Sequence, residues 1–381
     1  SSSRPVFAPD AARTDVRQWW RRQLRELAEM GVRYFKLDFF APRVSEPARS
    51  KNPTGELIAA AYEAFREACP PGTHLAPCSC DTNLQLGHCD SVRIGADIGE
   101  AGSWPAGMSH YRRGLASIAS MWFKQRRFWV NDPDSAQIGK GCSLGEARVR
   151  ATAAAFSGGH FMAGEDLRSA SPERLEIIRR LLPVYPVAAR PLDLFAAATP
   201  DGYPAVWALA VRADGVERVA LALFNLDPQV RRFEVSAAML GLEASAPFAA
   251  YEWWQSRFLG VHTGRLEVEV ASGDVAVIHA GAVAAHPTLV SASHHHTPWH
   301  IVRECRWDEK TRALRGAIET KPGLKITLFG QAPRDWRLTV RGRFDGAVGG
   351  DGNWQYTLET SGLRTPFTVP FERPSTSGGL S

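Results

Sequence analysis

The chain has 381 residues, 44% of them hydrophobic and 22% charged, which is the composition of an ordinary soluble globular protein large enough for two domains. Its net charge is +5, and the arginines that dominate the basic residues are interleaved with glutamates. This pattern predicts a solvated surface and excludes a nucleic-acid partner. The sequence contains no run of 18 apolar residues and no signal peptide, so we expect no membrane segment.

The six cysteines are irregularly spaced, which favours reduced thiols over a disulfide framework. A cytoplasmic protein is therefore favoured. The localisation is left open because the first residue is Ser rather than Met.

The first half of the chain alternates predicted helices and strands. Residues 14–30 have the apolar spacing of an amphipathic helix that ends at Gly31. Further helices are expected at about 54–69, 107–123, 144–156 and 172–182, and strands at about 34–38, 74–77, 91–94, 127–131 and 161–163. Five strands, each followed by a helix-sized segment, are typical of a parallel α/β fold.

A closed (β/α)₈ barrel needs eight such units. We therefore predict an incomplete (β/α)₈ barrel, consisting of about the last five β/α units, and expect the first three strands to precede residue 1. This expectation also implies that the chain in this form lacks one wall of its pocket.

The sequence pattern changes at about Pro191, where short segments with the pattern of β-strands are separated by turn residues such as Asp214-Gly215. This pattern predicts an antiparallel β-sandwich. The expected domains are a partial barrel at 1–188, a C-terminal sandwich at 189–283, a further β-rich region at 284–374 and a flexible tail at 375–381.

Two aspartates stand at the ends of predicted strands, Asp38 after 34–37 and Asp97 after 91–94. They are 59 positions apart, about twice the ~30 residues of one strand-helix unit. In a (β/α)₈ barrel this spacing places both at the C-terminal ends of strands, where catalytic groups lie. Two carboxylates across a sugar are the catalytic groups of glycoside hydrolysis. Each aspartate alone favours a helix cap or a salt bridge, whereas the basic residue near each one and the regular strand-helix alternation around them favour catalysis.

Several motifs occur in one order along the chain: Lys36-Leu37-Asp38, Arg93–Asp97 followed by Trp104, Arg127–Asp134, Glu165–Leu167 and Arg190–Phe195. Together they resemble glycoside hydrolase family 36, the α-galactosidases of clan D, over roughly residues 14–300. The family's first three strands, which contact the C4 and C6 hydroxyls of galactose, have no counterpart here. The exact sugar, the linkage and the oligomeric state are therefore left open.

The resemblance implies a retaining α-galactosidase that needs no cofactor and acts on terminal α-galactosides. It makes Asp38 the nucleophile that forms a glycosyl ester and Asp97 the general acid/base. An acid/base must be protonated at rest, so we expect a less solvated site around Asp97 or a like charge near it.

Four further residues are candidates for binding substrate. Lys36 points to the same side of its strand as Asp38 and would keep that carboxylate charged. Arg93 is expected to hold a sugar hydroxyl or the nucleophile, with a structural salt bridge as the alternative. Cys78 and Trp104 are placed at the pocket wall, and core packing is the alternative for both.

Asn131, Asp132 and Asp134 are assigned to organising the loop around the pocket rather than to chemistry. The cluster His294-His295-His296 with His300 suggests a metal, but adjacent residues on an extended chain point to opposite sides, so no metal is predicted. The alternative to an enzyme is a catalytically incomplete fragment that acts at most as a carbohydrate-binding or assembly module.

Overall fold

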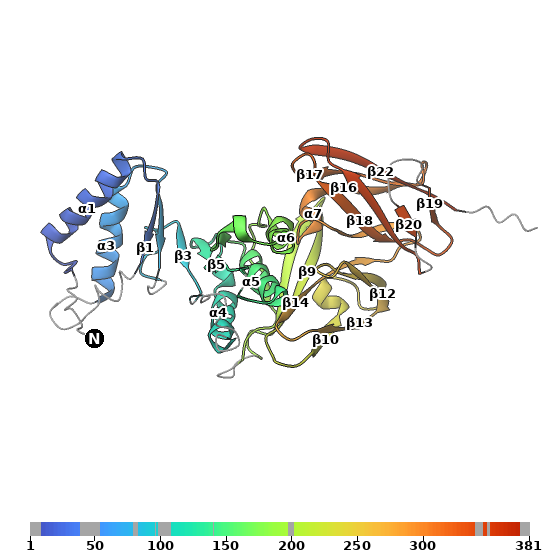
Figure 1. The fold of residues 1–381 in the computed structure, drawn as a ribbon, viewed down its shortest axis with the longest axis horizontal. Helices are drawn as coiled ribbons and strands as arrows, with labels where there is room; N and C mark the ends of the chain where they lie inside the picture. The colour runs from blue at the N-terminus through green and yellow to red at the C-terminus, as the bar shows by residue number, and fades with distance from the viewer. Residues whose placement is uncertain are drawn as a thin grey trace, which may run out of the picture.

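The computed structural model describes residues 9–38, 54–78, 83–95, 97, 108–139, 141–196, 202–339, 346–348 and 351–373. In Figure 1 the chain runs from the helices α1 and α3 at one end of the long axis to the strands β16–β22 at the other. Trp104, one of the predicted pocket residues, lies outside the described residues.

Short parallel strands form a row in chain order: β1 (Tyr34–Leu37), β2 (His74–Pro77), β3 (Ser91–Arg93) and β4 (Val130–Asp132). β1 pairs with β2, and β3 pairs with β4. Asp90 joins the two pairs, because its N–H donates to Leu75 O at 3.0 Å and its carboxylate accepts the Leu75 N–H at 2.8 Å. Beyond β4, the His160 N–H donates to Asn131 O at 2.8 Å. The parallel α/β arrangement predicted for this half is therefore present.

A third parallel pair, β5 (Ser135–Ala136) with β6 (Met162–Ala163), follows β4. The helices of this half are α1 (Thr14–Glu29), α3 (Thr54–Ala68), α4 (Met108–Ser120), α5 (Leu144–Phe156) and α6 (Pro172–Leu181), with the 3₁₀ turns η1 (Trp122–Lys124) and η2 (Leu167–Ser169). Each helix begins and ends within three residues of its predicted bounds.

Helices α1 and α3 cover only one face of the β1–β2 pair. Phe35 and Leu75 point into the core that these helices form with side chains such as Trp20 and Phe65. Alternate residues of a strand face opposite sides. Tyr34 is accordingly 44% exposed, whereas Phe35 is 8% exposed. The opposite face of β1 is the one that carries the candidate site.

Helix α5 joins the parallel half to the antiparallel half. It begins with a capping box in which Ser143 accepts the Glu146 N–H and Glu146 accepts the Ser143 N–H, and from Glu146 to Phe156 almost every residue is buried. Arg148 pairs with Asp274 at 2.5 Å, and the Trp254 indole donates to Thr152 at 3.0 Å.

The antiparallel half begins with a six-stranded sheet in the order β12-β11-β14-β9-β8-β7. Its strands are β7 (Arg190–Pro191), β8 (Val206–Ala213), β9 (Val216–Asn225), β11 (Pro247–Glu252), β12 (Arg257–Thr263) and β14 (Asp274–Ala282). A separate pair, β10 (Arg231–Ser236) with β13 (Arg265–Val270), shares its apolar core. The 3₁₀ turn η3 (Ala237–Leu240) follows β10.

Two four-stranded antiparallel sheets enclose a further core. One has the order β15-β18-β21-β20 and the other β16-β17-β22-β19. The strands are β15 (Thr288–Ala292), β16 (Val302–Asp308), β17 (Ala313–Glu319), β18 (Lys325–Gln331), β19 (Arg337–Leu338), β20 (Gly346–Val348), β21 (Asn353–Glu359) and β22 (Arg364–Glu372), and the short helix α7 (Pro298–Ile301) precedes β16. The β-rich character expected after residue 284 is observed, whereas the predicted domain bounds remain a prediction.

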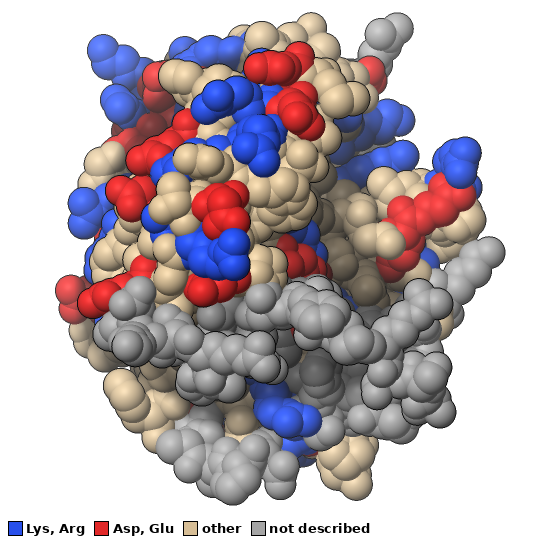
Figure 2. All heavy atoms as spheres, turned by 90° about the vertical axis from the view of Figure 1, so that its left-hand side faces the viewer, with Lys and Arg blue, Asp and Glu red and all other residues tan. Residues whose placement is uncertain are grey.

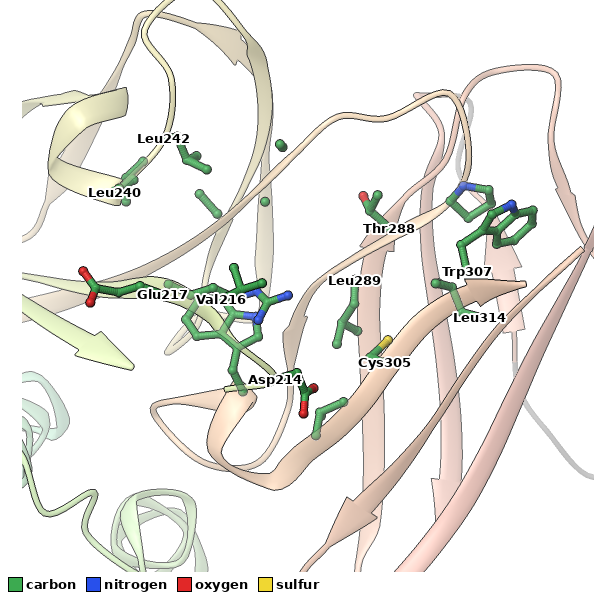
Figure 3. Close-up of a pocket in the computed structure, with 18 of the residues that line it drawn as sticks. Asp214, Val216, Glu217, Leu240, Leu242, Thr288, Leu289, Cys305, Trp307 and Leu314 are labelled. Atoms are coloured by element: carbon green, nitrogen blue, oxygen red, sulfur yellow. The ribbon is translucent and has the colours of Figure 1, made fainter. Parts of the chain in front are cut away.

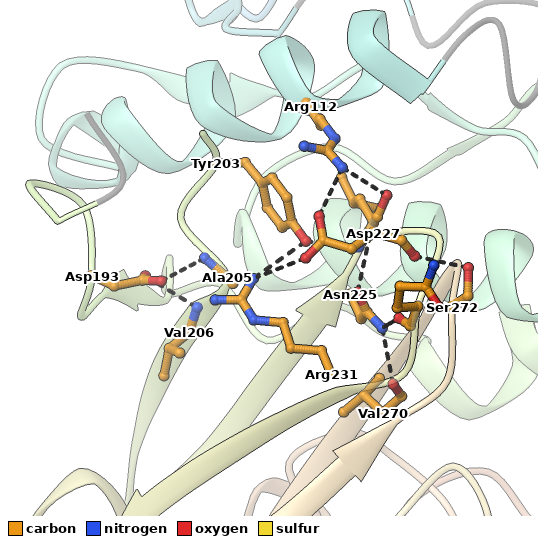
Figure 4. A network of polar contacts seen from close by, with 12 residues as sticks. Arg112, Asp193, Tyr203, Ala205, Val206, Asn225, Asp227, Arg231, Val270 and Ser272 are labelled. Carbon is orange, nitrogen blue, oxygen red and sulfur yellow. Dashed lines mark hydrogen bonds and ion pairs between the residues drawn. The ribbon is translucent and has the colours of Figure 1, made fainter. Parts of the chain in front are cut away.

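A polar network fastens α4 to the six-stranded sheet (Figure 4). Arg112 donates to Asp227 at 2.7 Å and to Leu226 O at 3.1 Å. The Tyr203 hydroxyl accepts the Leu226 N–H at 2.8 Å, and Arg231 lies 3.7 Å from the Asp227 carboxylate. The two halves of the chain are thus tied by charged hydrogen bonds as well as by apolar packing.

The surface mixes both signs of charge. Figure 2 shows basic and acidic side chains interleaved over the end of the molecule that carries α1 and α3. The exposed pairs Arg13–Asp15 and Arg21–Glu67 belong to this face. Among the described helices, none is both long and apolar enough to cross a membrane.

The histidines of the 294–300 segment lie where α6, β14 and α7 meet, and the His295 ring bonds to main-chain carbonyls and to the Thr297 hydroxyl. His295 Nε2 lies 2.6 Å from Pro183 O, and His279 lies 2.8 Å from the Ser291 hydroxyl and 3.0 Å from His296 O. Burial lowers the pKa of His279 and of His295 to about 3. Within the described residues, no three His, Cys, Asp or Glu side chains converge as a metal site.

The lowered pKa values of His279 and His295 predict that the folded protein becomes less stable in acid. An ordinary histidine has a pKa of 6.5, so the unfolded chain binds more protons than the folded chain between about pH 6.5 and 3. The free energy of unfolding should therefore fall as the pH drops through this range. Urea denaturation at a series of pH values measures the slope.

The variant His279→Gln with His295→Asn keeps polar partners at both positions but removes both titrations, so its slope should be shallower than that of the wild type. Glu252 acts in the opposite sense, because burial raises the pKa of its carboxyl. The comparison between variant and wild type cancels that contribution. Equal slopes would show that the two histidines are not responsible.

Candidate active site

Strand β1 presents Lys36 and Asp38 on the face turned away from the helices. The Lys36 ammonium lies 3.5 Å from Asp38 Oδ2, and the two side chains are 49% and 34% exposed. Partial burial alone would lower the pKa of Lys36, but the nearby Cys78 and Asp38 outweigh it and raise that pKa above its usual value. Lys36 is therefore a firm positive charge beside Asp38, as the sequence predicted.

Strand β3 supplies Arg93, whose side chain is only 5% exposed. Its Nη2 donates to Asp97 Oδ1 at 2.8 Å and contacts Asp134 Oδ2 at 2.5 Å. Its Nη1 lies 3.8 Å from the Cys78 sulfur. Of the two hypotheses for Arg93, the structure displays the ion pair: one buried guanidinium is shared by two carboxylates.

Asp134 is the residue of this cluster that sequence reasoning assigned to the loop alone. Its φ of +78° is a left-handed conformation that Asp tolerates better than most residues. The turn is closed by the Asp134 N–H, which donates to Asp132 Oδ1 at 3.0 Å. The available signal was the position of Asp134, an aspartate two residues beyond the end of the parallel strand β4.

The chain can reach this geometry because two glycines follow α5. Gly158 has a φ of +70°, and a Cβ on Gly159 would lie 1.8 Å from Asn131 O. Only glycine allows the backbone to approach β4 this closely. The turn at Gly158 and Gly159 therefore packs directly against the backbone of β4, the strand that carries Asn131 and Asp132.

Asp97 differs from the expectation of a less solvated site. Its side chain is 85% exposed, and its partner is a cation rather than a like charge. The prediction of a shielded acid/base is therefore wrong for the arrangement seen here, in which an exposed carboxylate pairs with the buried Arg93 guanidinium.

Five predicted residues thus gather at the ends of neighbouring parallel strands. Asp38, Cys78 and Arg93 lie close enough to Lys36 to shift its pKa electrostatically, and Arg93 hydrogen-bonds to Asp97. Cys78 is buried and follows β2, where its N–H donates to Leu37 O at 2.9 Å. The arrangement offers a carboxylate beside an ammonium, and a second carboxylate on a guanidinium.

A layer of aromatic rings lies at the opposite end of the same strands. Tyr34 stacks on His74 with ring centroids 4.9 Å apart, and His160 lies 5.4 Å from His74. His74 Nε2 is 2.7 Å from the Ser91 hydroxyl. Burial, followed by the charge of Asp132, raises the pKa of Tyr34. Sequence reasoning missed this layer, because its members are single residues far apart in the chain.

Comparison with known proteins supports the fold. No protein-family model matches the sequence. Similar solved structures include a family 27 β-L-arabinopyranosidase from Geobacillus stearothermophilus, with 15% identity and a TM-score of 0.53 over 71% of this chain and 62% of that one. Another is α-galactosidase I from Mortierella vinacea, with 14% identity and a TM-score of 0.51 over 68% and 70% of the two chains.

A third similar structure is the α-galactosidase from Saccharomyces cerevisiae with raffinose, with 12% identity and a TM-score of 0.50 over 68% of this chain and 74% of that one. At such identities the similarity shows a fold shared with these glycosidases, and it does not single out family 36. The present chain spans 62% of the length of the arabinopyranosidase.

The shared guanidinium predicts a stability role for Asp134. Asp134→Asn tolerates the same backbone but removes one charge, so we expect a loss of about 2 kcal/mol, below the ~3–5 kcal/mol of a fully buried pair because Asp97 still contacts Arg93. Urea denaturation measures the change.

The matched control is Asp166→Asn, since Asp166 pairs with Arg168 at 2.8 Å but both side chains are mostly exposed. That variant should leave the free energy of unfolding nearly unchanged. Equal effects of the two substitutions would mean that the Arg93–Asp134 contact stabilises the fold no more than an exposed ion pair does.

Proposed function

We propose that this chain is the catalytic part of a retaining α-glycosidase that hydrolyses terminal α-galactosides. The observation that carries the proposal is the gathering of Lys36, Asp38, Cys78, Arg93 and Asp97 on one rim of the parallel strands. The shared fold with α-galactosidases, one of them solved with raffinose, supports the substrate class.

The proposed fold is the incomplete (β/α)₈ barrel at 1–188 followed by the β-sandwich at 189–283. The row β1-β2-β3-β4 supports it, because its strands follow one another in chain order with parallel pairing. In the described part of the chain, β1 has one sheet neighbour, β2, so its other edge is where further strands would add.

In the first step, Asp38 attacks the anomeric carbon of the galactoside and forms a glycosyl ester. Asp97 transfers its proton to the glycosidic oxygen, so the aglycone leaves as an alcohol. In the second step, Asp97 takes a proton from water, and the resulting hydroxide displaces Asp38 and releases the sugar. Lys36 keeps Asp38 ionised before the attack and stabilises the carboxylate that is released in the second step.

Arg93 links this chemistry to Asp134. In the substrate-free arrangement Asp97 is paired with Arg93. When Asp97 turns towards a glycosidic oxygen, Asp134 remains on the same Nη2, so the buried guanidinium is never left without a carboxylate. Asp134 is thus a positioning residue that allows Asp97 to leave.

A second candidate is a carbohydrate-binding module without turnover. The high exposure of Asp97 and of Tyr34 favours it, because a glycosidase shields its acid/base from water. The complete gene product that contains this chain should be assayed on nitrophenyl α-galactoside, α-glucoside and N-acetyl-α-galactosaminide. Hydrolysis of the first identifies the enzyme, whereas galactoside binding without hydrolysis identifies the module.

Substitution of the two carboxylates separates their roles. Asp38→Asn should lower kcat by more than about 10³-fold on every galactoside, because an amide forms no glycosyl ester. Asp97→Asn should lower it by about 10²–10⁴-fold on natural sugars and much less on nitrophenyl galactosides, whose leaving group needs no proton. Near-wild-type turnover by Asp38→Asn would remove the nucleophile assignment.

Stereochemistry gives an independent check of the mechanism. Two displacements at the anomeric carbon return it to its starting configuration, so the first-formed galactose should be the α anomer. Proton NMR during the first minutes of reaction, before mutarotation, measures the anomer. Initial β-galactose would indicate direct attack by water.

A further inference from the structure

A cavity of about 340 Å³ lies far from the candidate active site, between the six-stranded sheet and the sheets that begin at β15 and β16. Figure 3 shows Asp214, Leu289 and Cys305 around its middle, Trp307 at one end, and Leu240 and Glu217 at the other. Its volume falls in the range of ordinary small-molecule sites.

One end of the cavity is aromatic. Trp307 and His286 stack with their rings nearly parallel, at 2° and a centroid separation of 5.3 Å. The Trp307 indole N–H is already satisfied, because it donates to Glu309 Oε2 at 2.5 Å. The stack is thus held rigid and presents an apolar surface to the cavity, which also receives the side chains of Leu289 and Leu314.

The Arg218 guanidinium and the Asp214 carboxylate also line the cavity, and they form no ion pair with each other. Within the described part of the chain, the Arg218 guanidinium makes no hydrogen bond or ion pair, and it lies 5.9 Å from the centroid of the Trp299 ring. Burial lowers the pKa of Arg218, although Cys305 and Asp214 draw it upwards. Asp214 Oδ2 accepts the Glu304 N–H at 2.7 Å. A ligand that supplies an acceptor to the guanidinium and a donor to the carboxylate would pair with both groups.

The other groups of the cavity narrow the ligand class. Glu217 is engaged by Arg212 at 3.1 Å, so Asp214 and Arg218 are the charges left facing the space, and they have opposite signs. An anion would meet Asp214 and a cation would meet Arg218. Burial raises the pKa of the Cys305 thiol to about 12, so it stays protonated and adds no charge.

We propose that this cavity binds the pyranose ring of a neutral sugar, with its apolar face on the Trp307–His286 stack and neighbouring hydroxyls bridging Arg218 and Asp214. A hydroxyl can donate to the carboxylate and accept from the guanidinium, which neither a simple ion nor a hydrocarbon can do. The site anchors glycans to the protein away from the catalytic rim, and it does not depend on hydrolysis.

The test uses the whole 381-residue chain with Lys36→Ala and Asp38→Ala, so that sugar bound at the candidate active site does not contribute. Calorimetry and saturation-transfer NMR with methyl α-galactopyranoside and methyl α-glucopyranoside should show saturable binding with a Kd of about 1 mM, as for one sugar ring. Arg218→Gln, and separately Trp307→Leu, should weaken it by about tenfold.

Arg232→Gln is the matched control, because Arg232 lies on β10 outside the cavity, pairs with Glu269 and has its side chain 74% exposed, and it should leave the affinity unchanged. Unchanged binding by Arg218→Gln would overturn the proposal, as would tighter binding of galacturonate than of the neutral sugars, or no saturable binding of either pyranoside. None of these results bears on turnover, so they are distinct from failure of the proposed hydrolysis.

Discussion

The rim of the parallel strands is organised by one buried positive charge. Arg93 is almost fully enclosed, and taking a guanidinium out of water is costly unless carboxylates surround it. Two carboxylates do so, Asp97 on the same chain segment and Asp134 from the loop beyond β4. The left-handed turn at Asp134 brings the second carboxylate to this charge, and the Cys78 sulfur lies 3.8 Å from Nη1.

The second constraint is the alternation of side chains along β1. Phe35 and Leu37 lie with the helices, so Tyr34, Lys36 and Asp38 must lie on the other side. That side holds an ammonium-carboxylate pair at one end of the strand and a stacked aromatic layer at the other. The same short sequence therefore builds both the apolar core and the polar site.

Much of this arrangement could be predicted from local sequence. The strand-helix alternation, the helix bounds and the pairing of Lys36 with Asp38 follow from periodicity and from one strand. The strands β11 and β12 were not predicted, because Pro247–Glu252 lacks the usual β-branched residues and gains its burial from neighbouring strands. The role of Asp134 and the exposure of Asp97 depend on which carboxylates reach Arg93, and that is set by contacts between distant segments.

The central claim is that Asp38 is the residue that becomes covalently attached to sugar. The most direct test treats the complete gene product that contains this chain with an α-galactosyl fluoride carrying a second fluorine at C5, which slows breakdown of a glycosyl ester. Mass spectrometry of the intact protein and of its peptides then locates the adduct. The account predicts one galactosyl group on the peptide that contains Asp38. An adduct on another carboxylate, or no adduct, would contradict it.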